Sequence, residues 1–176
     1  GVANGLAILH NAARARSPLV VTAGQQDTRH LMQEPVLAAD TVRMTEPFTK
    51  WSYEVRRADE APQALRRAIG LAKAPPTGPV FLSLPMNLMT ELVEDSGRSA
   101  APVSSLRRPD PEVLLRAADL LARARAPVII AGDGIARAQA LSELVALAEL
   151  VGAKVHGEPF YRRTNFPSDH PLWSGG

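Results

Sequence analysis

The side chains that could act as nucleophiles or metal ligands are few and scattered along this chain. There is no cysteine, which excludes thiolate chemistry, disulfides and cysteine-ligated metals. The four histidines show no metal-ligand spacing, and none accompanies a serine or cysteine in a nucleophile arrangement; they are His10, His30, His156 and His170. We therefore predict no catalytic residue and no metal ligand in this sequence, and we interpret the histidines as structural or surface residues.

Two other groups of residues have a possible chemical role. Gly132-Asp133-Gly134 resembles the start of a dinucleotide-binding turn, but the run that it opens lacks the third glycine of that fingerprint. An ordinary strand-to-helix turn is the interpretation we favour. Lys50, Trp51 and Tyr53 place a cation and two aromatic rings on an extended segment. This segment is either a subunit contact or active-site wall, or a sheet edge with Trp51 buried, and we favour the edge.

The elements that must position these residues alternate between helix and strand. Apolar residues at helical spacing predict helices, and short apolar runs next to proline or glycine predict strands covered on both faces. The helices are expected at residues 2–15, 59–74, 110–124 and 139–151, and the strands at 19–23, 80–84, 127–131 and 153–156. This order predicts an α/β fold with parallel sheets. Residues 25–53 show no sustained period, which is typical of a functional connection or of short helices.

A change of composition divides the chain into parts. Residues 91–109 are rich in serine, arginine, aspartate and proline and read as an interdomain linker. We therefore expect one domain portion at residues 1–90 and a second, Rossmann-like portion at residues 110–176. Because Gly1 opens inside a helical pattern and the chain closes just after an apolar Leu172-Trp173, we expect both to be parts of a longer protein.

Composition narrows the class of function. The chain has 20 basic and 18 acidic residues, a net charge of only +2, and its basic residues occur at most in pairs. Nucleic-acid binders gather such charge on one face, so we expect no nucleic-acid partner. No apolar run approaches the roughly 20 residues that span a bilayer, so we expect no membrane partner. The absence of cysteine fits a cytoplasmic location.

Three stretches carry a family likeness when they are taken in order. They are residues 17–26, SPLVVTAGQQ; residues 50–53, KWSY, with the later GPVFLSLP at 78–85; and APVIIAG at 126–132 with FPSDHP at 166–171. Together they resemble the thiamine-diphosphate-dependent enzymes, most closely the benzoylformate decarboxylase group and then the acetolactate synthases. The resemblance implies the C-terminal part of a pyrimidine-binding parallel α/β domain, followed by the first half of a Rossmann-like central domain.

That resemblance implies a function for the intact protein. It would be a decarboxylase of a small 2-keto acid that uses thiamine diphosphate and magnesium, or alternatively an acetolactate-synthase-type carboligase. In this family the activating glutamate lies upstream and the magnesium-binding domain downstream of the portion seen here. Such enzymes form homodimers or homotetramers with the active site between subunits. We therefore expect this chain alone to be inactive and to bind no cofactor.

The resemblance also implies cofactor-binding residues. Gln25, after the strand-ending Gly24, would point its amide toward the cofactor or substrate, because an amide both donates and accepts hydrogen bonds. Asn4 on the opening helix could face the pyrimidine in the same way. The alternative for each amide is a structural role, bonded to backbone or packed on its helix. The family's magnesium motif also begins Gly-Asp-Gly, but it needs an Asn-Asn pair that this sequence lacks.

Two readings from other classes remain open. Residues 110–157 could form a stand-alone nucleotide-binding or regulatory α/β module. The chain could also be a purely structural domain that dimerises through exposed sheet edges and apolar patches.

Overall fold

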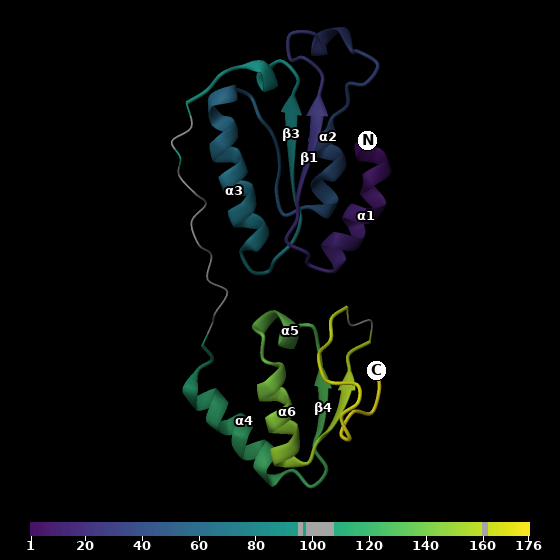
Figure 1. The fold of residues 1–176 in the computed structure, drawn as a ribbon, viewed down its shortest axis with the longest axis vertical. Helices are drawn as coiled ribbons and strands as arrows, with labels where there is room; N and C mark the ends of the chain where they lie inside the picture. The colour runs from purple at the N-terminus through teal and green to yellow at the C-terminus, as the bar shows by residue number, and fades with distance from the viewer. Residues whose placement is uncertain (95–96, 98–107, 160–161) are drawn as a thin grey trace. The chain divides into compact units, whose positions relative to one another are not determined.

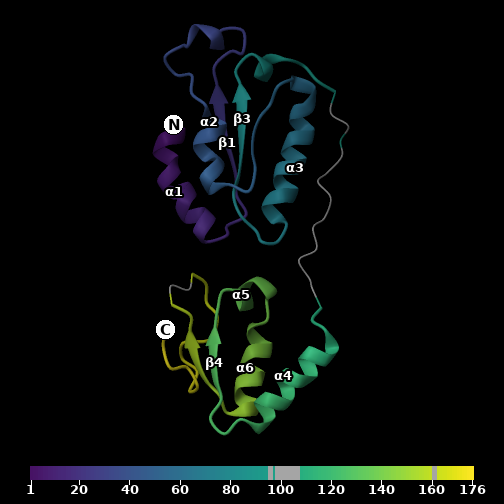
Figure 2. The same cartoon turned by 180° about the vertical axis from the view of Figure 1, so that it is seen from behind.

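The computed structural model describes residues 1–94, 97, 108–159 and 162–176. The chain forms two compact units, Gly1–Ser105 and Leu106–Gly176, and each contains helices and parallel strands (Figures 1 and 2). The predicted α/β class with parallel sheets is confirmed. Most of the linker predicted at residues 91–109 lies outside the described residues. No helix in the described part of the chain is long and apolar enough to cross a membrane.

The first unit is built on a three-stranded parallel sheet in the order β1-β3-β2. Its strands are β1 (Val20–Gln25), β2 (Ser52–Glu54) and β3 (Val80–Pro85). The apolar runs that predicted β1 and β3 do form strands. The strand β2 has only three residues, which is too short for an alternating pattern to be detected in the sequence.

Helices cover both faces of this sheet (Figures 1 and 2). Helix α3 (Ala61–Lys73) lies on one face, and α1 (Val2–Arg14) and α2 (Thr41–Thr45) lie on the other. Short 3₁₀ helices occupy the connections, at Leu31–Gln33, Glu46–Phe48, Ala58–Glu60 and Leu88–Thr90. The core under α3 contains Val55, Ala64, Ala68, Ala72, Val80 and Leu82. The buried contacts of α3 run through its alanines, whereas Leu65 is 45% exposed.

Strand alternation assigns polar side chains to one face of the sheet. Leu82 packs with the core under α3, so the next residue, Ser83, faces the side of α1 and α2. The strand register places Glu54 opposite Ser83, and Gln25 opposite Pro85. Gln25, Glu54 and Ser83 therefore share one face near the carboxyl ends of three neighbouring strands.

In the second unit a helix precedes a β-α-β arrangement with two parallel strands. Its elements are α4 (Pro111–Arg123), β4 (Val128–Ala131), α5 (Gly134–Ala138), α6 (Leu141–Val151) and β5 (Lys154–Gly157). Strands β4 and β5 pair in parallel, and a bridge from Val155 to Trp173 adds a segment at the other edge of β5. The predicted start of α4 is confirmed, because the Asp110 side chain accepts a hydrogen bond from the backbone of Glu112.

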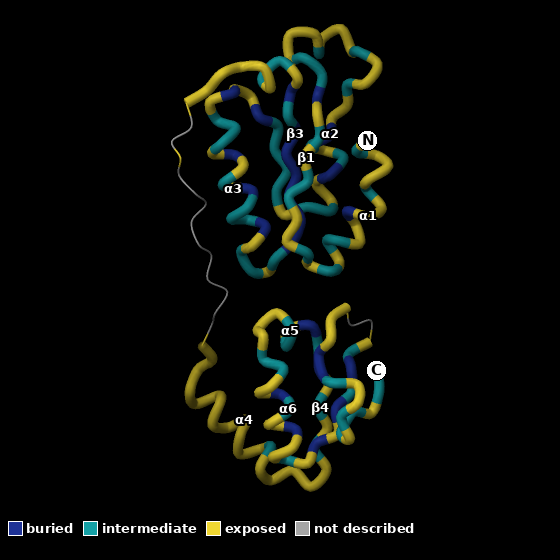
Figure 3. Tube along the Cα trace, in the orientation of Figure 1, coloured by how far each residue is buried: buried dark blue, intermediate teal, exposed yellow. Residues whose placement is uncertain are grey.

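The core of the second unit lies between α6 and one face of its sheet. It contains Ala131, Leu144, Ala148, Val155 and Phe166. The opposite face is open, and almost the whole of α4 is exposed (Figure 3). Leu120 of α4 is 72% exposed and Ile130 of β4 is 70% exposed. The prediction that β4 is covered on both faces is therefore wrong for the described residues, since only the face toward α6 is covered.

Candidate cofactor and substrate pocket

A cavity of about 840 Å³ lies at the carboxyl ends of β1 and β2 in the first unit. Gln25 and Glu54 line it from the sheet, and residues of the loop 31–42 line it from the other side. In open parallel α/β sheets, ligands bind in crevices outside the carboxyl ends of the strands. The cavity is therefore the candidate functional site of this unit.

Gln25 is held in place by bonds from both ends of its side-chain amide. The residue is only 7% exposed, and its Nε2 donates to Ala39 O at 2.7 Å and to Glu54 Oε2 at 3.2 Å. Its Oε1 accepts a hydrogen bond from the backbone N–H of Gln26 at 3.0 Å. Both amide protons are thus used within the protein, so Gln25 orients Glu54 and the loop rather than offering a free donor.

Glu54 and Ser83 are polar residues of this site that the sequence did not single out. Ser83 is fully buried, and its hydroxyl donates to Glu54 Oε2 at 2.8 Å. A signal was present, because a serine interrupts the apolar run of β3 and a glutamate ends the extended segment after Trp51. The hydrogen bond between Ser83 and Glu54 depends on the strand order, in which β3 lies between β1 and β2. The sequence alone does not predict that order.

The cavity is lined by both apolar and charged side chains. Val36 lines the cavity and is 99% exposed, and its neighbour Leu37 is 79% exposed. The charged residues of the lining are Glu34, Asp40, Glu54 and Arg56. This combination can contact an aromatic or aliphatic body and can accept hydrogen bonds from a ligand.

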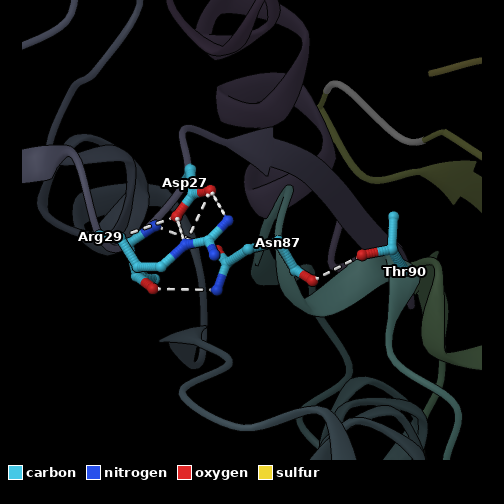
Figure 4. Close-up of polar contacts among 5 residues, drawn as sticks. Asp27, Arg29, Asn87 and Thr90 are labelled. Atoms are coloured by element: carbon cyan, nitrogen blue, oxygen red, sulfur yellow. Dashed lines mark hydrogen bonds and ion pairs between the residues drawn. The ribbon is translucent and has the colours of Figure 1, made fainter.

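Hydrogen bonds tie the loop after β1 to the turn after β3 (Figure 4). The backbone of Thr28 donates to Asn87 Oδ1, and Asn87 Nδ2 donates to Thr28 Oγ1, each at 3.0 Å. Asp27 pairs with Arg29 through both carboxylate oxygens. The hydrogen bond from the Arg29 side chain lowers the pKa of Asp27 to about 2. These contacts fix the start of the loop that goes on to form one wall of the cavity.

The aromatic segment at β2 forms a separate, smaller site. The rings of Trp51 and Tyr53 stack with centroids 5.3 Å apart, and the Arg67 guanidinium lies 5.3 Å from the Trp51 ring. A cavity of about 260 Å³ adjoins these side chains. Lys50 points to the end of α3, where Nζ donates to Leu71 O and to Ala74 O at 2.6 Å, and partial burial lowers its pKa. The strand β2 is a sheet edge, as the favoured interpretation predicts, although Trp51 is only half-buried.

The Gly132-Asp133-Gly134 turn is closed by hydrogen bonds from its own unit. Asp133 Oδ1 accepts from the backbone of Arg162 at 3.0 Å, from that of Arg163 at 3.1 Å and from Asn165 Nδ2 at 3.4 Å. Burial opposes ionisation of Asp133, but these hydrogen bonds outweigh it and lower its pKa. The Glu158 carboxylate fills the space over Gly132, where an added Cβ would lie 2.7 Å from Oε2. The turn therefore has a structural role, as the sequence led us to expect.

Comparison with known proteins shows which enzymes the chain resembles. Residues 114–176 match the family described as thiamine pyrophosphate enzyme, central domain. Over 99% of its length the chain is 35% identical to a benzoylformate decarboxylase of Pseudomonas aeruginosa, of which it covers 34%. It superposes on the crystal structure of a benzoylformate decarboxylase from Polynucleobacter necessarius with a TM-score of 0.90 and 40% identity, covering 99% of this chain and 33% of that one. The chain is thus similar to thiamine-diphosphate-dependent enzymes over nearly its whole length.

The chain also resembles an acetolactate synthase. The chain is 27% identical to a probable acetolactate synthase large subunit of Methanocaldococcus jannaschii, over 99% of this chain and 30% of that protein. The chain thus spans about a third of the length of the relatives that it matches.

The described residues fit only part of a thiamine diphosphate site. Glu54 and the polar lining can accept hydrogen bonds from a neutral ring that carries an amino group. For the diphosphate, Arg56 is the one cation in the lining of this cavity, and the described residues contain no group of three histidine or acidic side chains that could hold a metal ion. Where described, the chain therefore offers no anchor for a magnesium diphosphate.

The three residues expected to bind the cofactor of this family occupy different surroundings. Gln25 lines the cavity, and its amide nitrogen donates to Ala39 O and to Glu54 Oε2. Gly24 precedes it in β1 and is exposed, and an added Cβ would meet no atom within 4 Å. Asn4 is exposed on α1 and is not part of the cavity lining. A role in cofactor binding for these residues stays a prediction.

Proposed function

We propose that this chain forms one wall of the active site of a decarboxylase that acts on aryl 2-keto acids such as benzoylformate. The observation that carries the proposal is the likeness to benzoylformate decarboxylases over 99% of the chain, in sequence and in fold. The apolar side chain of Val36 supports an aromatic substrate, since it lines a cavity that also has hydrogen-bond acceptors.

Thiamine diphosphate, when bound, supplies the electron sink for decarboxylation of the keto acid. The residues of this chain have supporting tasks. Gln25 fixes the position of the loop through Ala39 O, and Val36 offers an apolar contact to the bound ring. The first part of the chain, residues 1–90, would be the end of the pyrimidine-binding domain. Residues 110–176 would open the central domain, which the family match to residues 114–176 supports.

The first test is a decarboxylation assay on the full-length protein. We expect it to release carbon dioxide from benzoylformate in the presence of thiamine diphosphate and magnesium, and to lose that activity when both are removed. Activity can be followed by coupled detection of benzaldehyde. Full-length protein that binds the cofactor but leaves benzoylformate unchanged would refute the proposed substrate.

The 176-residue chain gives a second test, since we propose that the magnesium and diphosphate ligands lie in the rest of the protein. We expect isothermal titration calorimetry to detect no micromolar binding of thiamine diphosphate to this chain, and we expect no turnover of benzoylformate by it. Micromolar binding by the chain alone would show that it contains a complete cofactor site.

An acetolactate-synthase-type carboligase is the second candidate, because the chain matches a probable acetolactate synthase over 99% of its length. An assay with pyruvate as the substrate distinguishes the two activities. A carboligase forms acetolactate from pyruvate, whereas an aryl keto-acid decarboxylase turns over benzoylformate in preference.

We also propose that the full-length protein is a homodimer or homotetramer. Light scattering after gel filtration measures the molar mass that decides between these states.

A further inference from the structure

The Glu54 carboxylate has one oxygen bound by the protein and one oxygen left over. Ser83 Oγ and Gln25 Nε2 both donate to Oε2. Within the described residues no hydrogen bond reaches Oε1, although the side chain is only partly exposed and lines the cavity of about 840 Å³. A partly buried carboxylate oxygen without a protein partner can accept a hydrogen bond from a ligand.

The partners of Oε2 are among the most firmly placed side chains of the unit. Ser83 is fully buried in the central strand β3, and Gln25 is 7% exposed with a further bond to Ala39 O. The parallel register brings all three side chains to one face of the sheet. Glu54 is therefore preorganised before a ligand binds, which favours selective recognition.

We propose that Glu54 is a specificity-determining residue that selects an aryl 2-keto acid with a hydroxyl or amino donor on its ring. The ring donor bonds to Glu54 Oε1, while Ser83 and Gln25 are positioning residues. This inference rests on the proposed function for the identity of the substrate class.

The charges of the cavity determine which end of the substrate lies at Glu54. The lining holds the three carboxylates of Glu34, Asp40 and Glu54 against the single cation of Arg56. This excess of negative charge disfavours the carboxylate of a keto acid and accepts a neutral hydroxyl or amino group. The keto-acid end of the substrate therefore lies away from Glu54, and the ring substituent lies toward it.

A ring that has no donor binds less well for a physical reason. It would cover the Glu54 carboxylate and remove water from Oε1 without replacing the lost hydrogen bond. Sites built to bond a substrate hydroxyl discriminate strongly against analogues that lack it. The specificity constant kcat/KM should therefore be higher for 4-hydroxybenzoylformate than for benzoylformate, by about tenfold to a hundredfold.

The kinetic test compares these two substrates on the full-length protein. In wild type we expect the preference for the hydroxylated substrate, and in Glu54→Gln we expect the ratio of the two kcat/KM values to fall toward one. Ser83→Ala should raise KM for the hydroxylated substrate by a larger factor than KM for benzoylformate. Glu143→Gln is the matched control, because Glu143 also accepts from a serine, Ser142, but is exposed on α6 of the other unit. An unchanged ratio in Glu54→Gln would overturn the inference.

A binding test on the 176-residue chain separates this inference from the proposed function. The isotope-labelled chain is titrated with 4-hydroxybenzamide and with benzamide, and amide shifts are followed by NMR. We expect 4-hydroxybenzamide alone to move the signals of Tyr53 and Glu54, and Glu54→Gln to abolish this effect. Equal shifts from both probes, or none from either, would contradict the role of Glu54. Turnover of neither keto acid by the full-length protein would refute the proposed function, while these shifts still report on Glu54.

Discussion

At the scale of single residues, the carboxylates of this chain differ in what their hydrogen bonds do. Asp133 is buried and accepts three hydrogen bonds on one oxygen, whereas Glu54 leaves an oxygen for a ligand. The first arrangement closes a turn and the second leaves an acceptor in a cavity. A carboxylate whose oxygen is already bonded within the protein thus has a structural role, whereas one with an oxygen left over can recognise a ligand.

Replacing Asp133 should destabilise the second unit. In Asp133→Ala, three donors lose a charged acceptor, and we expect a loss of about 2–4 kcal/mol in the free energy of unfolding at neutral pH. Because the folded pKa of Asp133 is lowered, its stabilising contribution is complete above the ordinary value of 3.8 and is lost as the pH falls below it. Urea unfolding at pH 7 and at pH 3 measures both effects. Asp169→Ala, at an exposed site, is the control and should change little.

The lowered pKa of Asp27 should depend on its neighbour. In Arg29→Ala the side-chain hydrogen bonds to the carboxylate are lost, so the pKa of Asp27 should rise from about 2 toward 3.8. In wild type the pair stabilises the loop above pH 3.8, and this effect is lost as the pH approaches 2. NMR titration of the Asp27 carboxyl carbon measures the pKa directly. Arg57→Ala, which breaks the similar pair with Asp59, should leave the Asp27 titration unchanged.

At the scale of elements, two glycines should respond to alanine in opposite ways. Gly70 lies inside α3 with open space around an added Cβ, so Gly70→Ala should stabilise the first unit by about 0.5–1 kcal/mol. Gly152 ends α6 with φ of +65°, a conformation that alanine adopts only under strain. Gly152→Ala should therefore destabilise the second unit by about 1–2 kcal/mol. Thermal unfolding followed by circular dichroism compares the two. Equal effects of the two substitutions would mean that backbone conformation does not decide the outcome.

The sequence predicts elements better than it predicts their contacts. Apolar spacing and nearby proline or glycine predicted α4 and the strands β1 and β3, because those signals are local. The pairing of β1 with β3, 60 residues further along the chain, is not a local property. The site residues Glu54 and Ser83 were therefore missed, although Gln25 was found through the family likeness. The exposure of α4 was also missed, because an apolar stripe does not reveal what covers it.

At the scale of the whole molecule, the open apolar surface of the second unit should govern behaviour in solution. Val113, Leu114, Leu115 and Leu120 of α4 and Ile130 of β4 are all exposed. We expect the 176-residue chain to bind the dye ANS and to associate as its concentration rises. Leu114→Glu with Leu120→Glu should reduce both effects, as measured by fluorescence and by sedimentation velocity. A matched pair of exposed polar substitutions, Arg116→Glu and Arg123→Glu, should reduce neither.

The strand order of the first unit also has a consequence for synthesis on the ribosome. Strands β1 and β2 both bond to β3 and not to each other, and β3 is made last. A nascent chain that has emerged only as far as Thr77 would carry β1 and β2 without the strand that joins them in this sheet. Emergence of Val80–Pro85 supplies that strand to both at once, so the β1-β3-β2 pairing should form late and abruptly during translation.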